Sequence, residues 1–364
     1  MPPSLWQALG AAVAEGLAEG SGTAANPSRQ AGGSRLSLNS IAGSLASVVG
    51  DAIERRVQQA TLAHADGEDV ALAVLMLRLA EYAYLNERAQ VDARLRGEGF
   101  QLIHFNKASF LPQWFIARGS LARQGGPANA FFCAFRGTDS QADVVRDLMV
   151  SAVEHHGIRF HEGFLSGVLS DEVLAAQLAA TVGAERSTPL YLIGHSLGGS
   201  LAATVPCAGL LPQSFAGPVH VFQFGSPPGL LGMPPPGQLA PAAARARILC
   251  FVNDADAVPR LLGSPLPLVA RTLLKTTSSR PGGTHHSDRA GPGVDELLEL
   301  LPRFMHLEHA EVVLLRGGSA FQVGLAERPA VLHLHEALRL NVMADHGIEN
   351  YRRALEAAIR GGLR

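Results

Sequence analysis

The stretch PLYLIGHSLGGSLAA, residues 189–203, decides the fold. Its first six residues are almost wholly apolar and predict a buried strand, and the small residues that follow predict a helix over 197–210. Between the two lies GHSLG, residues 194–198, which fits the pattern G-x-S-x-G. A strand, a sharp turn centred on a serine and a helix together form the frame that a nucleophilic serine requires.

The central residue of this turn, Ser196, is the candidate nucleophile. A serine hydroxyl attacks poorly until a base takes its proton. The turn is expected to hold Ser196 in a strained backbone conformation, while Gly194 and Gly198 let strand and helix crowd together. The helix start aims N–H groups, that of Leu197 among them, at the oxygen that becomes negative during attack. The alternative is a glycine-rich turn without chemistry, and His195 is expected to pack beside it as a structural residue.

Further strand-like and helical runs alternate on both sides of this stretch. The strand-like runs are FQLIHF (100–105), QWFIAR (113–118), AFFCAF (130–135), VHVFQFG (219–225) and RILCFV (247–252). Helical patterns cover 41–57, 69–95 and 162–182. This alternation predicts an α/β fold with a mostly parallel central sheet and helices on both faces.

The chain of 364 residues is expected to form one domain. Apolar residues make up 47% of it, enough for one large core. Residues 1–40 are predicted to be a weakly ordered tail, and residues 41–364 the single domain. Two proline-rich stretches, 226–241 and 263–270, and the polar region 275–293 are predicted as surface excursions from the sheet.

Charge and cysteine usage exclude several classes of protein. The net charge is −2, and no basic stripe with interleaved aromatic residues occurs, so a nucleic-acid partner is not expected. No uncharged apolar run reaches the ~18 residues that a transmembrane helix needs. Cys133, Cys207 and Cys250 each lie in an apolar run and are predicted to be buried free thiols, which favours a reducing compartment.

Six sequence blocks occur in a fixed order along the chain. They are FRGTDS (135–140), HEGF (161–164), GHSLGGSLA (194–202), FGSP (224–227), VNDADAVPRL (252–261) and DHGIENYRRAL (345–355). In this order they resemble the class 3 (fungal-type) lipases, and the resemblance implies the α/β-hydrolase fold. The Gly-Thr-Asp-Ser and Gly-Gly-Ser-Leu-Ala variants are similar to plastid and algal members. The disulfides common in secreted fungal members have no cysteines here, so an intracellular location, cytoplasmic or plastid, is expected, with secretion as the alternative.

The acid and the base of an α/β-hydrolase follow the serine in chain order. Asp254 and Asp256 come just after RILCFV; the resemblance favours Asp256 as the acid, and Asp254 suits a turn. Seven histidines follow Asp256. His346 lies on a glycine-containing turn before the last helix and is the expected base, with His309 as the second candidate.

The loop after AFFCAF is expected to supply a second oxyanion donor. The resemblance assigns this role to Thr138, whose N–H would meet that of Leu197 at one oxygen. The alternative is a simple Gly-Thr turn. The resemblance also implies a short lid at 139–150, where an ordinary surface helix is the alternative. The apolar face of this segment consists of Val144, Val145, Leu148 and Met149.

The resemblance implies a carboxylic ester hydrolase that acts on acylglycerol-type lipids through an acyl-enzyme on Ser196. It also implies transient contact with a lipid–water interface and no metal or organic cofactor. Phospholipase A1 and galactolipase are close alternatives that share the same motif. A non-catalytic lipid-binding scaffold is a further alternative, but the intact set Ser196, Asp256 and His346 speaks against it. The family usually continues with Arg-Val-Gly after Pro227, whereas here a proline-rich run follows. The shape of the acyl pocket is therefore expected to depart from the family pattern.

Overall fold

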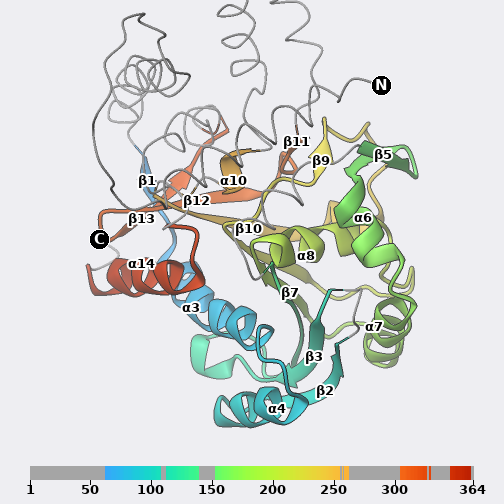
Figure 1. Cartoon of the computed structure of the whole chain (residues 1–364), viewed down its shortest axis with the longest axis horizontal. Helices are drawn as coiled ribbons and strands as arrows, with labels where there is room; N and C mark the ends of the chain where they lie inside the picture. The colour runs from blue at the N-terminus through green and yellow to red at the C-terminus, as the bar shows by residue number, and fades with distance from the viewer. Residues whose placement is uncertain are drawn as a thin grey trace, which may run out of the picture.

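The computed structural model describes residues 62–107, 112–138, 152–254, 256, 258–261, 304–325, 328 and 345–361. Over these residues the chain forms a nine-stranded sheet with helices on both faces and a smaller four-stranded sheet beside it (Figure 1). The predicted helix over 41–57 and the regions 263–270 and 275–293 lie outside the described residues. The tail over 1–40 and the domain boundary at 41 stay predictions.

The large sheet is parallel in its centre and antiparallel at both edges. Its order is β1-β13-β12-β10-β8-β7-β4-β3-β2. The parallel strands are β4 (Ala130–Phe135), β7 (Leu190–His195), β8 (Val219–Phe224), β10 (Arg247–Asn253) and β12 (Glu311–Arg316). The antiparallel strands are β1 (Ala63–His64), β2 (Gln101–Asn106), β3 (Trp114–Gly119) and β13 (Ser319–Val323). The predicted α/β-hydrolase fold is confirmed, with the addition that the strands at both edges are antiparallel.

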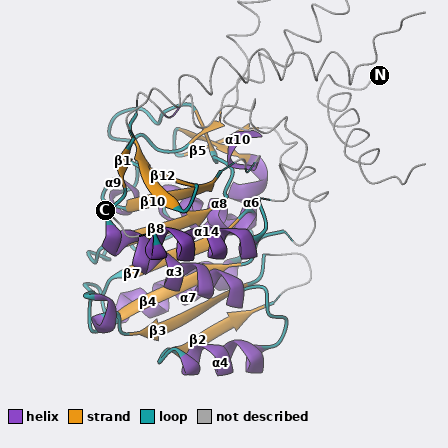
Figure 2. Cartoon of the chain, turned by 90° about the vertical axis from the view of Figure 1, so that its left-hand side faces the viewer, coloured by secondary structure: helices purple, strands orange, loops and turns teal. Residues whose placement is uncertain are grey.

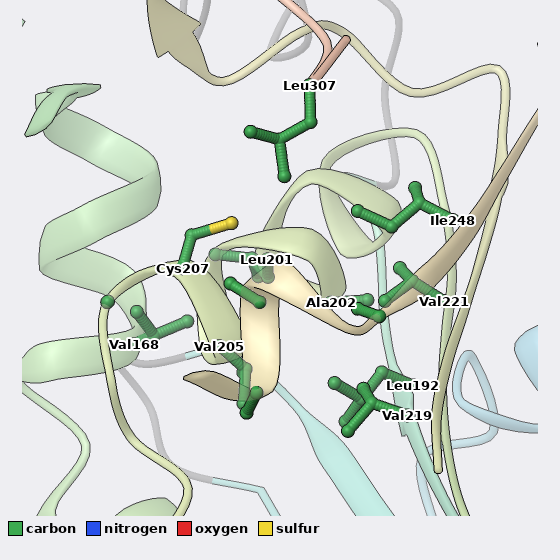
Figure 3. Packing of buried hydrophobic residues seen from close by; sticks show 14 of the residues in the cluster. Val168, Leu192, Leu201, Ala202, Val205, Cys207, Val219, Val221, Ile248 and Leu307 are labelled. Carbon is green, nitrogen blue, oxygen red and sulfur yellow. The ribbon is translucent and has the colours of Figure 1, made fainter. Parts of the chain in front are cut away.

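Two of the parallel strands, β4 and β7, are buried along their whole length. Every residue of β4 and of β7 is buried, as their unbroken apolar runs predict for strands covered on both faces. Side chains along β7 alternate between two cores. Figure 3 shows Leu192 of β7 and Val221 of β8 in the same cluster as Leu201 of the helix above them.

Helices cover both faces of the sheet (Figures 1 and 2), and among the described residues three longer ones lie on each face. On one face lie α3 (Gly67–Tyr82), α4 (Arg88–Gly97) and α14 (Ile348–Arg360). On the other lie α6 (Glu162–Leu169), α7 (Glu172–Ala184) and α8 (Leu197–Cys207). The short elements η1 (Ala122–Gln124), α9 (Pro241–Ala244) and α10 (Val258–Leu261) occupy connections. Figure 2 shows α3 and α14 side by side in front of the strands, and the two helices are in contact.

Two of the predicted helices are each divided in two. The single helix expected over 69–95 is wrong: α3 ends at Tyr82, and α4 begins at Arg88. The carboxamide of Gln113 donates to two main-chain carbonyls of the intervening turn, and these bonds hold the chain out of the helix. The predicted helix over 162–182 is divided at Asp171, whose carboxylate accepts from the N–H of Leu174 and caps α7.

The four-stranded sheet was not predicted. Its order is β11-β9-β6-β5, formed by β5 (Ala152–His155), β6 (Ile158–His161), β9 (Leu230–Leu231) and β11 (Phe304–Met305). Strands of two to four residues are too short for an alternating pattern to be visible in sequence. The prediction that 226–241 is wholly a surface excursion is wrong, because Leu230 and Leu231 are buried in the core next to α8.

The three cysteines are buried free thiols, as predicted. Burial raises the pKa of Cys207 and of Cys250 to about 12, so both thiols stay neutral. Among the described helices, none has by itself the length and hydropathy to cross a bilayer. Of the described helices, the pair α6 and α7 has enough length and hydropathy when the two are taken together, but it is bent by 64° at the break between them.

Candidate active site

The serine turn has the strained backbone that the sequence predicts. Strand β7 ends at His195 and helix α8 begins at Leu197, with Ser196 alone between them. Ser196 has φ +56° and ψ −131°, a conformation that residues with a β-carbon rarely adopt. Its N–H donates to the carbonyl of Phe224 on β8 at 2.9 Å, which fixes the turn to the neighbouring strand.

The two glycines of the turn are needed for close approach, as predicted. A methyl group at Gly194 would lie 2.1 Å from the carbonyl carbon of Gly198. A methyl group at Gly198 would lie 2.3 Å from the carbonyl oxygen of Phe135 at the end of β4. Strand, helix and neighbouring strand therefore meet at van der Waals distance only because both positions lack a β-carbon.

Ser196, His346 and Asp256 lie together in one hydrogen-bonded row. The Nε2 atom of His346 is 2.9 Å from the Ser196 hydroxyl, and its Nδ1 atom is 3.0 Å from Oδ2 and 3.1 Å from Oδ1 of Asp256. All three side chains are buried. A carboxylate only accepts hydrogen bonds, so Nδ1 carries the proton and Nε2 accepts from the serine hydroxyl. This arrangement poises the imidazole to take the serine proton.

The topology explains why residues so distant in sequence meet. Strands β7 and β10 run in the same direction, with only β8 between them. Ser196 follows the end of β7 and Asp256 follows the end of β10, so both lie at the same sheet edge. His346 reaches this edge from the turn before α14, whose N-cap is Gly347.

The structure separates the remaining sequence candidates from this row. Asp254 lies in a turn, and its carboxylate accepts from Arg316 at 2.8 Å. His309 is exposed and precedes β12. Because β12 is parallel to β10, His309 stands at the opposite end of the strands from Ser196.

The carboxylate of Asp256 has three hydrogen-bond donors. Tyr351 on α14 donates its hydroxyl to Oδ2 of Asp256 at 2.6 Å, and the N–H of Val258 donates to Oδ1 at 2.9 Å. The third is His346. Burial favours the neutral carboxyl, but these three donors outweigh it and hold the pKa of Asp256 below its ordinary value. Asp256 is therefore ionised at neutral pH.

Tyr351→Phe is expected to lower kcat about tenfold and the free energy of unfolding by about 1–3 kcal/mol. The substitution removes a donor from the Asp256 carboxylate and also leaves the buried N–H of Asn253, which donates to the Tyr351 hydroxyl at 3.0 Å, without its acceptor. Ester turnover and urea unfolding measure the two effects. Tyr82→Phe is the control, because its hydroxyl binds Glu98 instead. Equal kcat values for both variants would contradict the expectation.

Three residues that hold Asp256 in place have no role predicted from the sequence. Besides Tyr351, they are Gly225 and Arg260. Gly225 has φ +59°, and a methyl group there would lie 2.6 Å from Oδ2 of Asp256. The guanidinium of Arg260 is fully buried and donates to the main-chain carbonyls of Asp254 and Asp256. All three lie within blocks already noted for their resemblance, and that was their only signal.

The two predicted oxyanion donors, Thr138 and Leu197, directly follow two residues that lie close together, Gly137 and Ser196. Phe135 at the end of β4 pairs with Gly194 of β7, so the next segment leaves the sheet beside the turn. A methyl group at Gly137 would lie 3.2 Å from Cβ of Ser196. Thr138 follows directly and is half-buried. Leu197 begins α8, where an N–H has no carbonyl one turn earlier in its own helix.

Val144, Val145, Leu148 and Met149 lie outside the described residues, so the lid stays a prediction. Within the described ranges, no three His, Cys, Asp or Glu side chains gather in a way that could hold a metal ion.

Two histidines make the fold sensitive to acid: His195 is buried, and His306 is half-buried with its Nε2 atom shielded from solvent. Burial, reinforced by the neighbouring His346, lowers the pKa of His195 to about 3, and burial with nearby Arg328 lowers that of His306 to about 4. In the unfolded chain both return to about 6.5. Below about pH 6.5 the unfolded state binds more protons than the folded state. The stabilising contribution of the two neutral imidazoles is therefore complete above this pH and is lost as the pH falls.

Between pH 6.5 and 4, each of these two histidines is expected to cost about 1.4 kcal/mol of unfolding free energy per pH unit. Urea unfolding at a series of pH values measures the slope. His306→Gln should flatten it, and the exposed His309→Gln should leave it as in the parent chain. A slope that does not respond to His306→Gln would contradict this assignment.

Fold and site together define an α/β-hydrolase that carries a buried Ser-His-Asp row. Residues 132–265 match the family model described as Lipase (class 3). The matched segment contains Ser196 and Asp256, and His346 lies beyond it. The resemblance to class 3 lipases is confirmed, and the chain is a carboxylic ester hydrolase of the lipase type.

Comparisons with other proteins give weaker likenesses. A search of curated proteins found no match. Among solved structures, a lipase from Yarrowia lipolytica is 15% identical over 78% of this chain and 94% of its own, with a TM-score of 0.48. A triacylglyceride lipase from Rhizomucor miehei is 18% identical over 72% of this chain and 86% of its own, with a TM-score of 0.46. TM-scores of this size support no conclusion about this chain.

Proposed function

We propose that the chain hydrolyses acylglycerol-type lipids, triacylglycerol or diacylglycerol, through an acyl-enzyme on Ser196. One observation carries this proposal: His346 lies 2.9 Å from the Ser196 hydroxyl and 3.0 Å from Asp256, within a strained strand-to-helix turn. The class 3 lipase match supplies the kind of ester.

In the first half-reaction, Oγ of Ser196 attacks the ester carbonyl carbon while its proton moves to Nε2 of His346. The carbonyl oxygen becomes negative and accepts from the N–H groups of Leu197 and Thr138. Asp256 stabilises the imidazolium through Nδ1–H. The carbon–oxygen bond to the glycerol side then breaks, and His346 returns the proton to the leaving alcohol. The acyl group remains on Ser196.

In the second half-reaction, water takes the place of the alcohol. His346 accepts a proton from the water as its oxygen attacks the acyl carbon, and the same two N–H groups stabilise the negative oxygen. Breaking the bond to Oγ releases the fatty acid, and the proton returns to Ser196. Ser196, His346 and Asp256 have then regained the protonation states in which they began, and no cofactor takes part.

A substrate panel tests this proposal. It pairs p-nitrophenyl esters from acetate to palmitate with triacylglycerol, diacylglycerol, phosphatidylcholine and galactolipid emulsions. Fatty acid released fastest from the acylglycerols supports the proposal, whereas faster release from the polar lipids would replace it with phospholipase A1 or galactolipase activity. A fluorophosphonate probe serves as the check on catalysis itself. No labelling and no hydrolysis together would favour a non-catalytic lipid-binding scaffold.

We also propose transient contact with a lipid–water interface. The support is the apolar face that the sequence predicts for Val144, Val145, Leu148 and Met149. Side chains of this kind are stabilised when they are buried in a lipid surface. Tributyrin hydrolysis measured across its solubility limit tests this contact. A jump in rate once droplets form is the expected result, and a smooth saturating curve would count against it.

A further inference from the structure

The residue before the nucleophile makes two hydrogen bonds that the proposed reaction does not use. His195 donates from Nε2 to the main-chain carbonyl of His346 at 2.7 Å. Its Nδ1 atom lies 2.9 Å from the hydroxyl of Tyr84. A carbonyl only accepts, so Nε2 carries the proton and Nδ1 accepts from Tyr84. The pair thus links the turn after α3, the serine turn and the turn that carries the base.

His195 is neutral at neutral pH and therefore keeps both bonds there. It is 5% exposed, and burial, followed by repulsion from the adjacent His346 ring, lowers its pKa to about 3. The two imidazoles are stacked, with ring centroids 4.8 Å apart. When His346 takes the serine proton, its neighbour therefore remains neutral and keeps the same tautomer.

Tyr84 is itself held in place from both sides. The carboxamide of Gln113 donates to the main-chain carbonyls of the residues immediately before and after Tyr84, at 2.6 and 2.7 Å. The guanidinium of Arg136 lies over the Tyr84 ring, 5.7 Å from its centroid. Arg136 begins the segment that carries Thr138, so the contact also joins Tyr84 to the expected oxyanion loop.

The Tyr84 hydroxyl lies where three parts of the site meet. A methyl group at Gly137 would stand 2.4 Å from this hydroxyl and equally close to the carbonyl oxygen of His195. The main chain at Gly137 therefore lies so close to the Tyr84 hydroxyl that no side chain would fit between them. The hydroxyl has room to reach Nδ1 of His195 because position 137 is a glycine.

The base needs such support because its ring is tied only at its two nitrogens. Asp256 fixes Nδ1 of His346, and Ser196 is the group on which Nε2 must act. The main chain of this turn is held at two carbonyls, that of Asp345 by Asn253 at 3.0 Å and that of His346 by His195. A shift of about 1 Å in a reacting group can cost a hundredfold in rate.

We propose that Tyr84 and His195 are positioning residues that hold His346 at its working distance from Ser196. This inference rests on the proposed function, because it concerns the base of that reaction. Their hydrogen bonds go to each other and to the main chain of His346, and not to the Ser196 hydroxyl or to the nitrogens of the His346 ring. A residue that only filled space at position 195 would need no imidazole, since burying a polar ring is costly unless its hydrogen bonds are made.

Tyr84→Phe tests the proposal with the smallest change. The ring and its contact with Arg136 remain, and only the hydroxyl is lost. We expect kcat to fall about tenfold, the effect of one buried hydrogen bond, with KM unchanged because no substrate contact is lost. The rate of fluorophosphonate labelling should fall by the same factor, since the same base activates Ser196. Tyr82→Phe, which removes the hydroxyl next but one in the chain, is the matched control.

A pair of substitutions at His195 separates positioning from packing. His195→Leu removes the donor to His346, and kcat should fall about a hundredfold. His195→Gln keeps an N–H at the same reach and should restore most of the lost rate. Rates are expressed per site titrated with the probe, so a misfolded fraction does not enter them, and thermal melting is recorded for each variant.

The outcomes distinguish this inference from the function on which it rests. An active parent chain with Tyr84→Phe as fast as Tyr82→Phe would overturn the positioning role alone. So would His195→Gln as slow as His195→Leu, because then no donor matters. A parent chain that neither hydrolyses esters nor reacts with the probe would overturn the proposed function, and the positioning role with it.

Discussion

Ser196→Ala is expected to lower ester turnover by about 10⁶-fold and to abolish labelling by a fluorophosphonate probe. The Oγ atom of this hydroxyl forms the bond to the acyl group, and no other group of the row can replace it. His346 and Asp256 remain buried and paired in this variant, but they have nothing to activate. Hydrolysis of a p-nitrophenyl ester and gel fluorescence after labelling measure the two losses.

Ser200→Ala is the matched control for this experiment. Ser200 lies one turn further along α8, and its hydroxyl donates to the carbonyl of Pro227 at 2.6 Å instead of taking part in the row. Labelling should persist in Ser200→Ala. If Ser196→Ala still labelled, or if Ser200→Ala lost its label, the nucleophile would lie elsewhere.

His346→Ala is expected to lower kcat by about four to six orders of magnitude, while KM stays close to that of the parent chain. Without the imidazole, the serine hydroxyl keeps its proton, and the leaving alcohol has no acid to protonate it. Asp256 also loses the partner that makes its buried charge favourable, so some stability is lost as well.

His309→Ala serves as the comparison, because the sequence alone made His309 the second candidate for the base. It is exposed at the far end of the strands, so its loss should leave kcat as it was. The assignment would fail if the two variants behaved alike, or if His309→Ala were the slower one. Steady-state kinetics on a soluble ester are sufficient.

Local patterns predicted much of the fold. The unbroken apolar runs of β4 and β7 identify central strands, and the serine between β7 and α8 identifies the turn, because both signals lie within a few neighbouring residues. The helix over 69–95 was predicted as continuous because its apolar period has no break in sequence. What divides it is the side chain of Gln113, which lies just before β3 and is distant in sequence from the helix.

The same limit applies to the site. Ser196, Asp256 and His346 stand in recognisable blocks, so their residue types and order are visible in the sequence. Tyr84 and Tyr351 look like ordinary apolar positions of helical segments. Their roles depend on hydrogen bonds to residues 111 and 95 positions away, which no local pattern encodes.

The separations within the hydrogen-bonded row bear on how the protein folds. Ser196 and His346 are 150 residues apart, and Asp256 and His346 are 90 apart. Closing loops of this length carries an entropic penalty that only a nearly complete chain can offset. We therefore expect individual helices and hairpins to form early and locally, and this row to come together last. Recovery of ester hydrolysis after dilution from denaturant therefore reports the final step of folding, and should lag behind the return of secondary structure.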